Sequence, residues 1–472
     1  MTILDVDDGL VKVPIITIQP AFTTVIQEVW SGIIPSEEVW LSRYHQGSDS
    51  IHDRIRVTLD EEDRDKVTWE SLRGKLELSR DDESGSYGVD SVRLLVPIQH
   101  YHLEETPKAR RITSLAISPD QSQFAVGLLD GSIYLYPIVP PRTAVKYPEP
   151  QVAEVLHIRQ TLVEALGKKT AHKSTVTSLR FFPSSRVLLS GGADFTMSIW
   201  PAEPLPPSSM SQKTASPTPA RTLMAHTRPI SSVAINPLDR GRTVLSGSAD
   251  GTVRTWNVSS GSEVVDRRIR HGGSGLSAMV LDPEAETLYC ALQDGSFEIF
   301  ALQLSSADQS ASNQNVPDEN TTAPPNQPLF KSGRSIGGAL TSIAVSSKSD
   351  STPRLLATGT VNGIVSIYLI DGELPTHLVS FKRNGANIEA LSFLPHPISN
   401  QSSLSLGLAV ATSDGLPWIA AISVDIATKV ATVTPYAELT GGEIDSVRDI
   451  VAISGEVWTV CDDGLVRRYL VA

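Results

Sequence analysis

From residue 112 onward, apolar and polar residues alternate in many short segments, as expected for half-buried β-strands. The segments 252–256 (TVRTW) and 296–300 (SFEIF) are examples. The segments recur in threes. The first is followed by a turn that often contains Pro, the second ends in Asp-Gly or a near relative, and the third ends in an aromatic residue. The pattern predicts a repeated unit of three β-strands.

The acidic residue of the Asp-Gly turn fixes the register of this repeat. Six positions after each such anchor stands an aromatic residue in six of seven repeats, although aromatic residues make up only 6% of the chain. Glycine follows the anchor in six repeats and supplies the positive φ of a tight hairpin turn, whereas Phe195 replaces it in the second. The anchors are Asp130, Asp194, Asp250, Asp294, Asn362, Asp414 and Asp463.

Three histidines add to the pattern, because His172, His226 and His271 each stand 22 to 24 residues before an anchor. The unit resembles the WD40 repeat, which implies an all-β fold, a seven-bladed WD40 β-propeller. The resemblance also implies a hydrogen-bonded tetrad in two blades, whereas the other five lack at least one member and are expected to rely more on apolar packing. The two implied structural tetrads are His172, Ser190, Asp194 and Trp200, and His226, Ser246, Asp250 and Trp256.

The first 90 residues do not match the repeat, so we expect a small acidic N-terminal domain at 1–90 and the propeller at 91–472. Alternating segments at 38–42 and 55–59 predict that the small domain is β-rich. The last repeat ends after Tyr469 without an outer strand of its own. We hypothesise that residues 91–97 supply that strand and close the propeller.

The anchors are 44 to 68 residues apart, more than the usual length of about 40–45 residues for this repeat, so some loops must be long. Residues 201–220 are rich in Pro, Ser and Thr, and residues 304–328 in Ser, Asn, Gln and Pro, which predicts disordered insertions. Residues 151–166 carry loosely periodic apolar positions that predict a short helix.

The net charge of −13 disfavours a nucleic-acid partner and suits a basic protein surface, although an acidic charge also serves solubility alone. Residues 1–100 carry 19 acidic and 10 basic side chains, densest at 60–65 and 81–83, where a solvated face is the alternative to a binding site. With only two cysteines, no signal peptide and no long apolar run, we expect a cytoplasmic and nuclear protein without membrane contact.

Motifs that carry chemistry are not apparent: we find no Walker loop, dinucleotide glycine fingerprint, zinc-ligand cluster or Ser-His-Asp signature. An alternative role for His172, His226 and His271 is that of metal ligands or bases. The placement of one such histidine in each of three repeats favours a structural role. We therefore expect no enzyme activity, no cofactor and no metal site.

A narrower resemblance lies in the second and third repeats. The segment 176–184 (VTSLRFFPS) contains a Phe-Phe-Pro-Ser turn, and 239–256 (DRGRTVLSGSADGTVRTW) has Asp-Arg-Gly-Arg at the same turn one repeat later. These residues are similar to the proteasomal ATPase-associated factor family and its fungal counterpart, a WD40 assembly chaperone of the proteasome regulatory particle. The resemblance implies a monomeric chaperone that binds the C-terminal domain of one proteasome base ATPase subunit.

Binding residues are expected where loops lead into the innermost strands and where the Asp-Gly turns lie. The acidic candidates there are Glu104, Glu105, Glu389, Glu443 and Asp445, for which ordinary solvated loop residues are the alternative. A second hypothesis for the function is a general WD40 scaffold or substrate receptor in ubiquitin ligation or ribosome maturation.

Overall fold

The computed structural model confirms the predicted fold class, a seven-bladed all-β propeller preceded by a small β-rich domain. The residues cluster into two compact units, which are described one at a time: residues 1–105, 139–157 and 346–472 form unit 1, and residues 106–138 and 158–345 form unit 2. The structure describes residues 9–471 except 64–65, 82–85, 103–110, 142–151, 157–160, 164–169, 204–217, 266–267, 283–286, 303–326, 348–352, 371–373 and 401–402.

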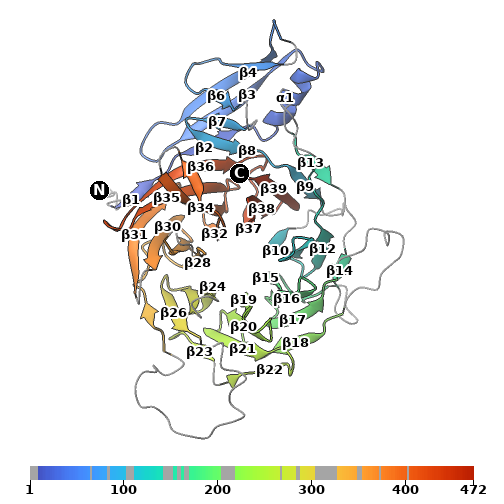
Figure 1. Ribbon diagram of the computed structural model, residues 1–472, viewed down its shortest axis with the longest axis vertical. Helices are drawn as coiled ribbons and strands as arrows, with labels where there is room; N and C mark the ends of the chain where they lie inside the picture. Colours follow the sequence, from blue (N-terminus) through green and yellow to red (C-terminus); the bar gives the residue numbers. More distant parts are fainter. Residues whose placement is uncertain are drawn as a thin grey trace, which may run out of the picture. The chain divides into compact units, whose positions relative to one another are not determined.

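Unit 2 contains blades 1 to 4, and Figure 1 shows them following one another in chain order. In each blade an inner strand pairs with a second, the second with a third, and the third with an outer strand, all antiparallel. Blade 1 has β10 (Ile112–Ile117), β11 (Gln123–Leu128), β12 (Ile133–Pro137) and β14 (Thr161–Val163), and blade 2 has β15 (Val176–Phe181), β16 (Val187–Gly192), β17 (Thr196–Pro201) and β18 (Arg221–Met224). Blade 3 has β19 (Ile230–Ile235), β20 (Thr243–Ser248), β21 (Thr252–Asn257), β22 (Ser262–Glu263) and β23 (Ile269–Arg270), and blade 4 has β24 (Leu276–Asp282), β25 (Thr287–Leu292), β26 (Phe297–Ala301) and β27 (Phe330–Lys331).

The apolar core of unit 2 lies between consecutive blades. One cluster joins Leu135 of blade 1 to Trp200 of blade 2, and another joins Leu189 of blade 2 to Trp256 of blade 3. A third joins Leu245 of blade 3 to blade 4. A single blade therefore leaves an apolar face uncovered, and stacking buries it, as in other repeat architectures.

The Asp-Gly turns connect the second and third strands of each blade, and we call the part of a blade that carries them its Asp-Gly end. There the turn of one blade bonds to the loop that leads into the next inner strand. The His172 N–H donates to the Gly131 carbonyl at 2.9 Å, and the His271 N–H donates to Gly251 at 2.9 Å. A Cβ atom at Gly131 would lie 2.3 Å from the His172 carbonyl oxygen, so this turn requires glycine.

Unit 1 contains blades 6 and 7 and most of blade 5. In the part of blade 5 that belongs to unit 1, β1 (Leu10–Lys12) pairs parallel with β31 (Pro375–Lys382), next to β30 (Ile364–Ile370) and β29 (Leu355–Thr360). The strand β28 (Leu340–Val345) belongs to unit 2. Blade 6 has β32 (Ile388–Phe393), β33 (Ile398–Asn400), β34 (Ser403–Thr412), β35 (Trp418–Asp425) and β36 (Val430–Leu439), and blade 7 has β37 (Val447–Ile453), β38 (Glu456–Cys461) and β39 (Leu465–Leu470).

The outer strand of blade 7 does come from the N-terminal side, but not from residues 91–97 as predicted. It is β9 (Gln99–His102), which pairs with β39 and also with β13 (Glu154–Leu156). The predicted segment forms β8 (Val92–Leu95), which pairs parallel with β36 of blade 6. The buried Gln99 side chain bonds to Glu154 and Arg468, and these polar contacts explain why the strand does not look apolar in the sequence.

The N-terminal domain is a four-stranded sheet with a helix. Its strands are β2 (Ile15–Ile18), β3 (Ser36–Tyr44), β4 (Ile51–Leu59) and β5 (Val67–Ser71), and the segments predicted at 38–42 and 55–59 lie in β3 and β4. The helix α1 (Phe22–Trp30) buries Phe22, Val25, Ile26 and Val29, which share one helical face.

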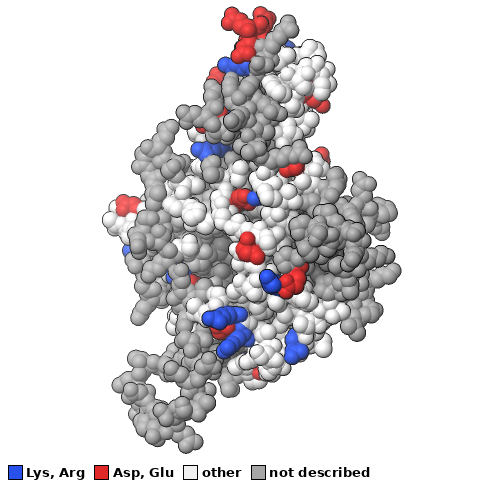
Figure 2. Space-filling model, turned by 45° about the vertical axis from the view of Figure 1, so that its right-hand side comes forward, with Lys and Arg blue, Asp and Glu red and all other residues white. Residues whose placement is uncertain are grey.

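The strands that follow this four-stranded sheet, still within the first 90 residues, belong to the sheet of blade 6. The hairpin of β6 (Leu78–Arg80) and β7 (Tyr87–Val89) pairs with β8, which pairs with β36, so the sheet runs past the domain boundary expected at residue 90 (Figure 1). Asp60, Glu61 and Glu62 belong to the turn between β4 and β5. Figure 2 shows carboxylates gathered at the top of the view.

Two other predictions concern the loops. The helix predicted at 151–166 is wrong, because this segment instead contributes β13 and β14 as edge strands of two different sheets. Residues 204–217 and 303–326, most of the two predicted disordered insertions, lie outside the described residues, as does nearly all of the acidic triplet at 81–83.

Candidate functional site

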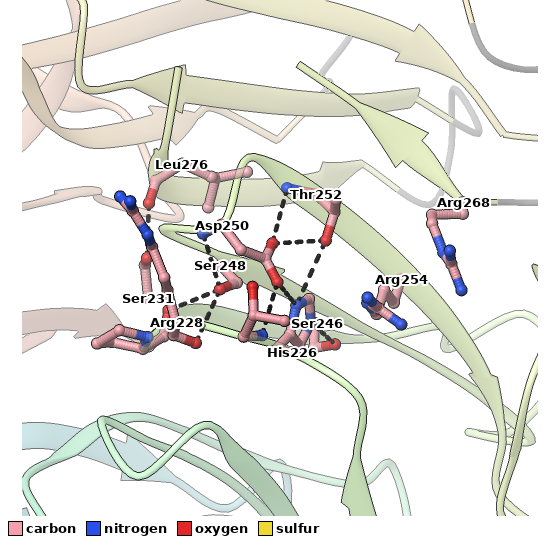
Figure 3. A network of polar contacts seen from close by, with 12 residues as sticks. His226, Arg228, Ser231, Ser246, Ser248, Asp250, Thr252, Arg254, Arg268 and Leu276 are labelled. Atoms are coloured by element: carbon pink, nitrogen blue, oxygen red, sulfur yellow. Dashed lines mark hydrogen bonds and ion pairs between the residues drawn. The ribbon is translucent and has the colours of Figure 1, made fainter. Parts of the chain in front are cut away.

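Three tetrad residues of blade 3, His226, Ser246 and Asp250, lie together at its Asp-Gly end (Figure 3), and Trp256 completes the set. Trp256 Nε1 donates to Ser246 Oγ at 2.8 Å, and Ser246 Oγ lies 2.7 Å from His226 Nε2. His226 Nδ1 lies 2.8 Å from Asp250 Oδ2. The carboxylate can only accept, so Nδ1 carries the imidazole proton and Ser246 donates its hydroxyl proton to Nε2. All four side chains thus have consistent hydrogen-bond roles.

Blade 2 repeats this geometry. His172 Nε2 lies 2.7 Å from Ser190 Oγ, which accepts from Trp200 Nε1 at 2.8 Å, and His172 Nδ1 lies 3.0 Å from Asp194 Oδ1. Asp194 also accepts the Lys173 N–H at 2.9 Å, which fixes the loop before β15. The structure therefore brings together all four residues of both tetrads implied by the sequence.

Burial and hydrogen bonding set the charge of the tetrad carboxylates. Burial raises the pKa of Asp194, but hydrogen bonds from His172, Lys173 and Thr196 outweigh it and hold the pKa well below its usual range. The pKa of Asp250 is lowered in the same way by Thr252 and His226. Burial lowers the pKa of His226 below 6.5, although Asp250 opposes this. The neutral imidazole is thus the form expected at neutral pH.

The hydrogen-bond order Ser-His-Asp in each tetrad resembles the triad of serine hydrolases, but a substrate cannot reach the serine hydroxyl. Ser190 and Ser246 are completely buried, and each hydroxyl already accepts a hydrogen bond from an indole. A nucleophilic serine must reach a substrate carbonyl beside an oxyanion hole. These serines cannot, so the tetrads stabilise blades and turns.

Blade 4 carries a changed version that sequence reasoning missed. His271 Nδ1 lies 2.6 Å from Glu298 Oε2 rather than bonding the anchor Asp294, and Lys331 donates to the other oxygen of Glu298 at 2.7 Å. Cys290 occupies the serine position and is fully buried, which raises its pKa. The buried His271 Nε2 has no hydrogen-bond partner among the described residues. In the sequence, the cysteine at the serine position was the sign that blade 4 has a changed network.

The acidic candidates for partner binding differ in their surroundings. Glu104 and Glu105 lie outside the described residues. Glu389 accepts from Asn387 at 2.9 Å and from Arg448 at 3.3 Å, and only 17% of its side chain is exposed. Glu443 and Asp445 are exposed on the loop before β37. The structure brings these two together and leaves Glu389 in an internal ion pair.

The loop at 441–446 is firmly placed. The Asp-Gly turn of blade 6 lies against it, since a Cβ atom at Gly415 would lie 2.5 Å from the Glu443 carbonyl oxygen. Ser446 Oγ also donates to the Ser413 carbonyl at 2.7 Å. Between the two carboxylates, Ile444 is 88% exposed, the most exposed large apolar side chain of the described residues. An anchored loop therefore presents an apolar side chain flanked by negative charge.

The described residues form neither a metal-ligand cluster nor a membrane-spanning helix. Among the residues that the structure describes, no three or more His, Cys, Asp or Glu side chains are grouped to hold a metal ion. None of the described helices has the length and hydropathy needed to cross a membrane.

Comparison with known proteins places repeats of a known type in blades 1 to 3. Residues 99–136, 164–201 and 217–257 match the family described as WD domain, G-beta repeat. The chain is 31% identical over 131 residues to the Pre-rRNA-processing protein IPI3 of Meyerozyma guilliermondii. The aligned residues are 27% of this chain and 28% of that protein.

Two further relatives are more distant. WD repeat-containing protein 18 of Danio rerio is 27% identical over 158 residues, covering 33% of this chain and 34% of the relative. Protein HIR1 of Eremothecium gossypii is 26% identical over 200 residues, which are 42% of this chain and 23% of the relative. The chain thus spans about a quarter to a third of the length of these relatives.

Proposed function

We propose that this chain, which carries WD40 repeats, is a non-catalytic assembly chaperone that binds the C-terminal domain of a proteasomal ATPase subunit and assists assembly of the regulatory-particle base. The observation that carries this proposal is the anchored loop with Glu443, Ile444 and Asp445. An apolar anchor flanked by carboxylates suits a basic surface that has an apolar pocket, because charge guides the encounter and apolar burial slows dissociation.

The two turns that carry the resemblance to the chaperone family support the proposal. Phe182 and Gly241 lie in contact, since a Cβ atom at Gly241 would lie 2.5 Å from Phe182 Cδ1. Gly241 also has φ of +82°, and its N–H bonds to Asp239 Oδ1 at 3.0 Å. The Phe-Phe-Pro-Ser and Asp-Arg-Gly-Arg turns therefore form one packed pair between blades 2 and 3, which explains why the two motifs occur together.

The proposed mechanism is steric and electrostatic. The protein occupies a surface of the ATPase subunit, holds the subunit in an assembly intermediate and leaves without changing a covalent bond. The buried tetrad serines agree with this mechanism, because Ser190 and Ser246 form hydrogen bonds inside the protein and cannot reach a bound partner.

A binding assay with the purified ATPase C-terminal domain tests the proposal. We expect Glu443→Lys together with Asp445→Lys to weaken binding about tenfold or more at low salt, and less at high salt, because screening shortens the range of the charges. The matched control is Glu61→Lys with Glu62→Lys, which makes the same charge change in the exposed β4–β5 turn. Calorimetry that gives equal affinity for wild type and both variants would remove the loop from the proposal.

A second candidate function is a scaffold in ribosome maturation, which the likeness to the Pre-rRNA-processing protein IPI3 favours. Affinity purification of the tagged full chain followed by mass spectrometry separates the two. Free ATPase subcomplexes without the proteolytic core indicate the chaperone, whereas pre-ribosomal proteins indicate the scaffold.

A further inference from the structure

Phe195 occupies a turn position that ordinarily takes glycine. It follows the anchor Asp194, where glycine stands in the six other repeats, and it has φ of +70°. The equivalent Gly251 of blade 3 has φ of +78°. A bulky side chain is disfavoured in this left-handed region, so Phe195 costs stability that glycine would not. Such an outlier is a reason to look for a function.

The Phe195 side chain does not disappear into the core to offset this cost. It remains 42% exposed, and among the described residues it stacks on no other ring. The turn itself is closed by the Phe195 N–H donating to Gly192, a bond that needs no particular side chain. Packing and turn geometry therefore do not account for an aromatic residue here.

A second exposed apolar side chain lies close by at the Asp-Gly end of blade 1. Thr175 connects the two turns, since its carbonyl accepts from the Ala193 N–H at 2.8 Å and its hydroxyl donates to the Leu129 carbonyl at 3.2 Å. Leu129 is 49% exposed. Leu129 and Phe195 are thus exposed apolar side chains on the two turns that border the loop at 172–175.

Three positive side chains lie on the same or neighbouring turns and loops. Lys173 lies on the flanking loop, Arg111 bonds through its carbonyl to the Leu129 N–H at 3.0 Å, and Arg228 lies on the corresponding loop of blade 3; all three are exposed. The carboxylates of Asp194 and Asp250 are at most 9% exposed and are engaged with their histidines, which leaves Asp130 as the exposed acid of these turns. Among the described residues of these turns and loops, three exposed cations thus stand against one exposed acid.

We propose that this surface, centred on Phe195 with Leu129, Lys173, Arg228 and Arg111, docks an acidic segment of a second protein that carries an apolar side chain. Aromatic and arginine side chains are enriched at protein interfaces, and the rim of an interface is polar. The occupant is a peptide rather than a nucleic acid, because Leu129 offers an aliphatic contact that suits an apolar side chain of a peptide and not a phosphate backbone. This site lies in unit 2 and shares no residue with the acidic loop at 441–446, so it is an additional activity.

Fluorescence anisotropy with labelled peptides tests the proposal on the full chain. The probe is a short peptide that alternates Glu and Asp with one Leu and one Phe; the comparison probes are the same peptide with Lys for each acid, and a short oligothymidylate. We expect Phe195→Asn to weaken binding of the acidic peptide about tenfold, since truncated hot-spot residues cost this much or more. Lys173→Glu with Arg228→Glu should weaken it similarly, and most at low salt.

Stability and location are controlled in the same experiment. Asn tolerates positive φ, so Phe195→Asn should melt within a few degrees of wild type, and lost binding cannot then be assigned to unfolding. Leu238→Ser removes another exposed apolar side chain, 55% exposed against 42% for Phe195, from the β19–β20 turn and should leave the affinity unchanged. The proposal is overturned if the oligothymidylate or the lysine peptide binds more tightly, or if Phe195→Asn and Leu238→Ser have equal effects.

Discussion

Blades 2 and 3 differ from blades 6 and 7 in the polar groups that stabilise them. In blades 2 and 3 a histidine connects a serine, an aspartate and a tryptophan of one repeat. Around blades 6 and 7 buried arginines do this work instead. Arg383, which follows β31, pairs with Glu438 of β36, and Arg467 pairs with Asp463 at 2.6 Å. Arg468 pairs with Glu456 at 2.8 Å.

The two kinds of network differ in how far they reach along the chain. The tetrads connect residues within a single repeat. The arginines also pair within their own repeat, as Arg467 does with Asp463, but they reach distant segments as well. Ile16 N donates to Glu438 Oε1 at 3.0 Å, 422 residues away, and Arg383 donates to the Pro14 carbonyl. Arg468 likewise reaches Gln99 of the closing strand at 2.9 Å. Blades 6 and 7 therefore depend on the N-terminal segment, and blades 2 and 3 on their own repeats.

The largest effect is expected where the arginine network is cut. Glu438→Gln leaves the buried Arg383 guanidinium without its counter-charge, and removal of one partner from a buried pair costs about 3–5 kcal/mol. Urea denaturation measures the loss. The matched control, Glu38→Gln, removes the partner of Arg54 and Arg56 on the exposed surface and should cost at most about 1 kcal/mol. Equal losses would show that the buried pair has no special role.

A smaller effect is expected in the tetrads. Ser246→Ala leaves both His226 Nε2 and Trp256 Nε1 unpaired in the core, at a cost of about 1–3 kcal/mol. In blade 4, Cys290→Ser makes the opposite change, because a hydroxyl at the same repeat position offers His271 Nε2 the partner it lacks. We expect Cys290→Ser to be neutral or stabilising. A loss as large as that of Ser246→Ala would contradict the equivalence of the two blades.

The pH dependence of stability should also separate the two regions. In the closing strand of blade 7, burial, Arg467 and His102 lower the pKa of His100 from 6.5 to about 4, and Asp463 only partly opposes them. Because the folded pKa is depressed, the unfolded chain binds the proton more readily. The contribution of neutral His100 is therefore complete above pH 6.5 and is lost as pH falls toward about 4.

Replacement of this histidine provides the measurement. Chemical denaturation of wild type between pH 7 and about 4 should show falling stability, and His100→Gln should reduce that slope because Gln does not titrate. His226→Gln is the comparison in blade 3, where Asp250 opposes the lowering of the histidine pKa. It should change the slope less. An unchanged slope in His100→Gln would show that this histidine is not a source of acid sensitivity.

The same contrast explains what could be predicted from the sequence. The seven anchors recur within repeats, so the register could be found by counting positions, and the resemblance to the WD40 repeat then implied the fold class and the eight tetrad residues. The Arg383–Glu438 pair and the closing strand β9 depend on contacts between segments hundreds of residues apart. One sequence without relatives gives no sign of such contacts.

Local patterns also failed where another strand decided the outcome. Residues 154–156 became the edge strand β13 because β9 offered backbone partners, which overrode their loose helical period. The exposed loop at 443–445 was found from its acidic residues, but the exposure of Ile444 and the ion pair of Glu389 were not, since both depend on which loops meet. The strain at Phe195 was visible only as a missing glycine.

The smallest expected effect tests that turn by comparing blade 2 with blade 3. Phe195→Asn loses the buried part of a ring but gains a residue that tolerates φ of +70°, so the two contributions oppose each other. We expect the free energy of unfolding to change by less than about 1 kcal/mol. Gly251→Ala in blade 3 places a Cβ atom 2.9 Å from the Ser274 carbonyl oxygen at φ of +78°, and should cost about 1–2 kcal/mol. If Phe195→Asn destabilised more than Gly251→Ala in the same urea titration, the ring would be a structural part of blade 2, and its exposure would need no partner to explain it.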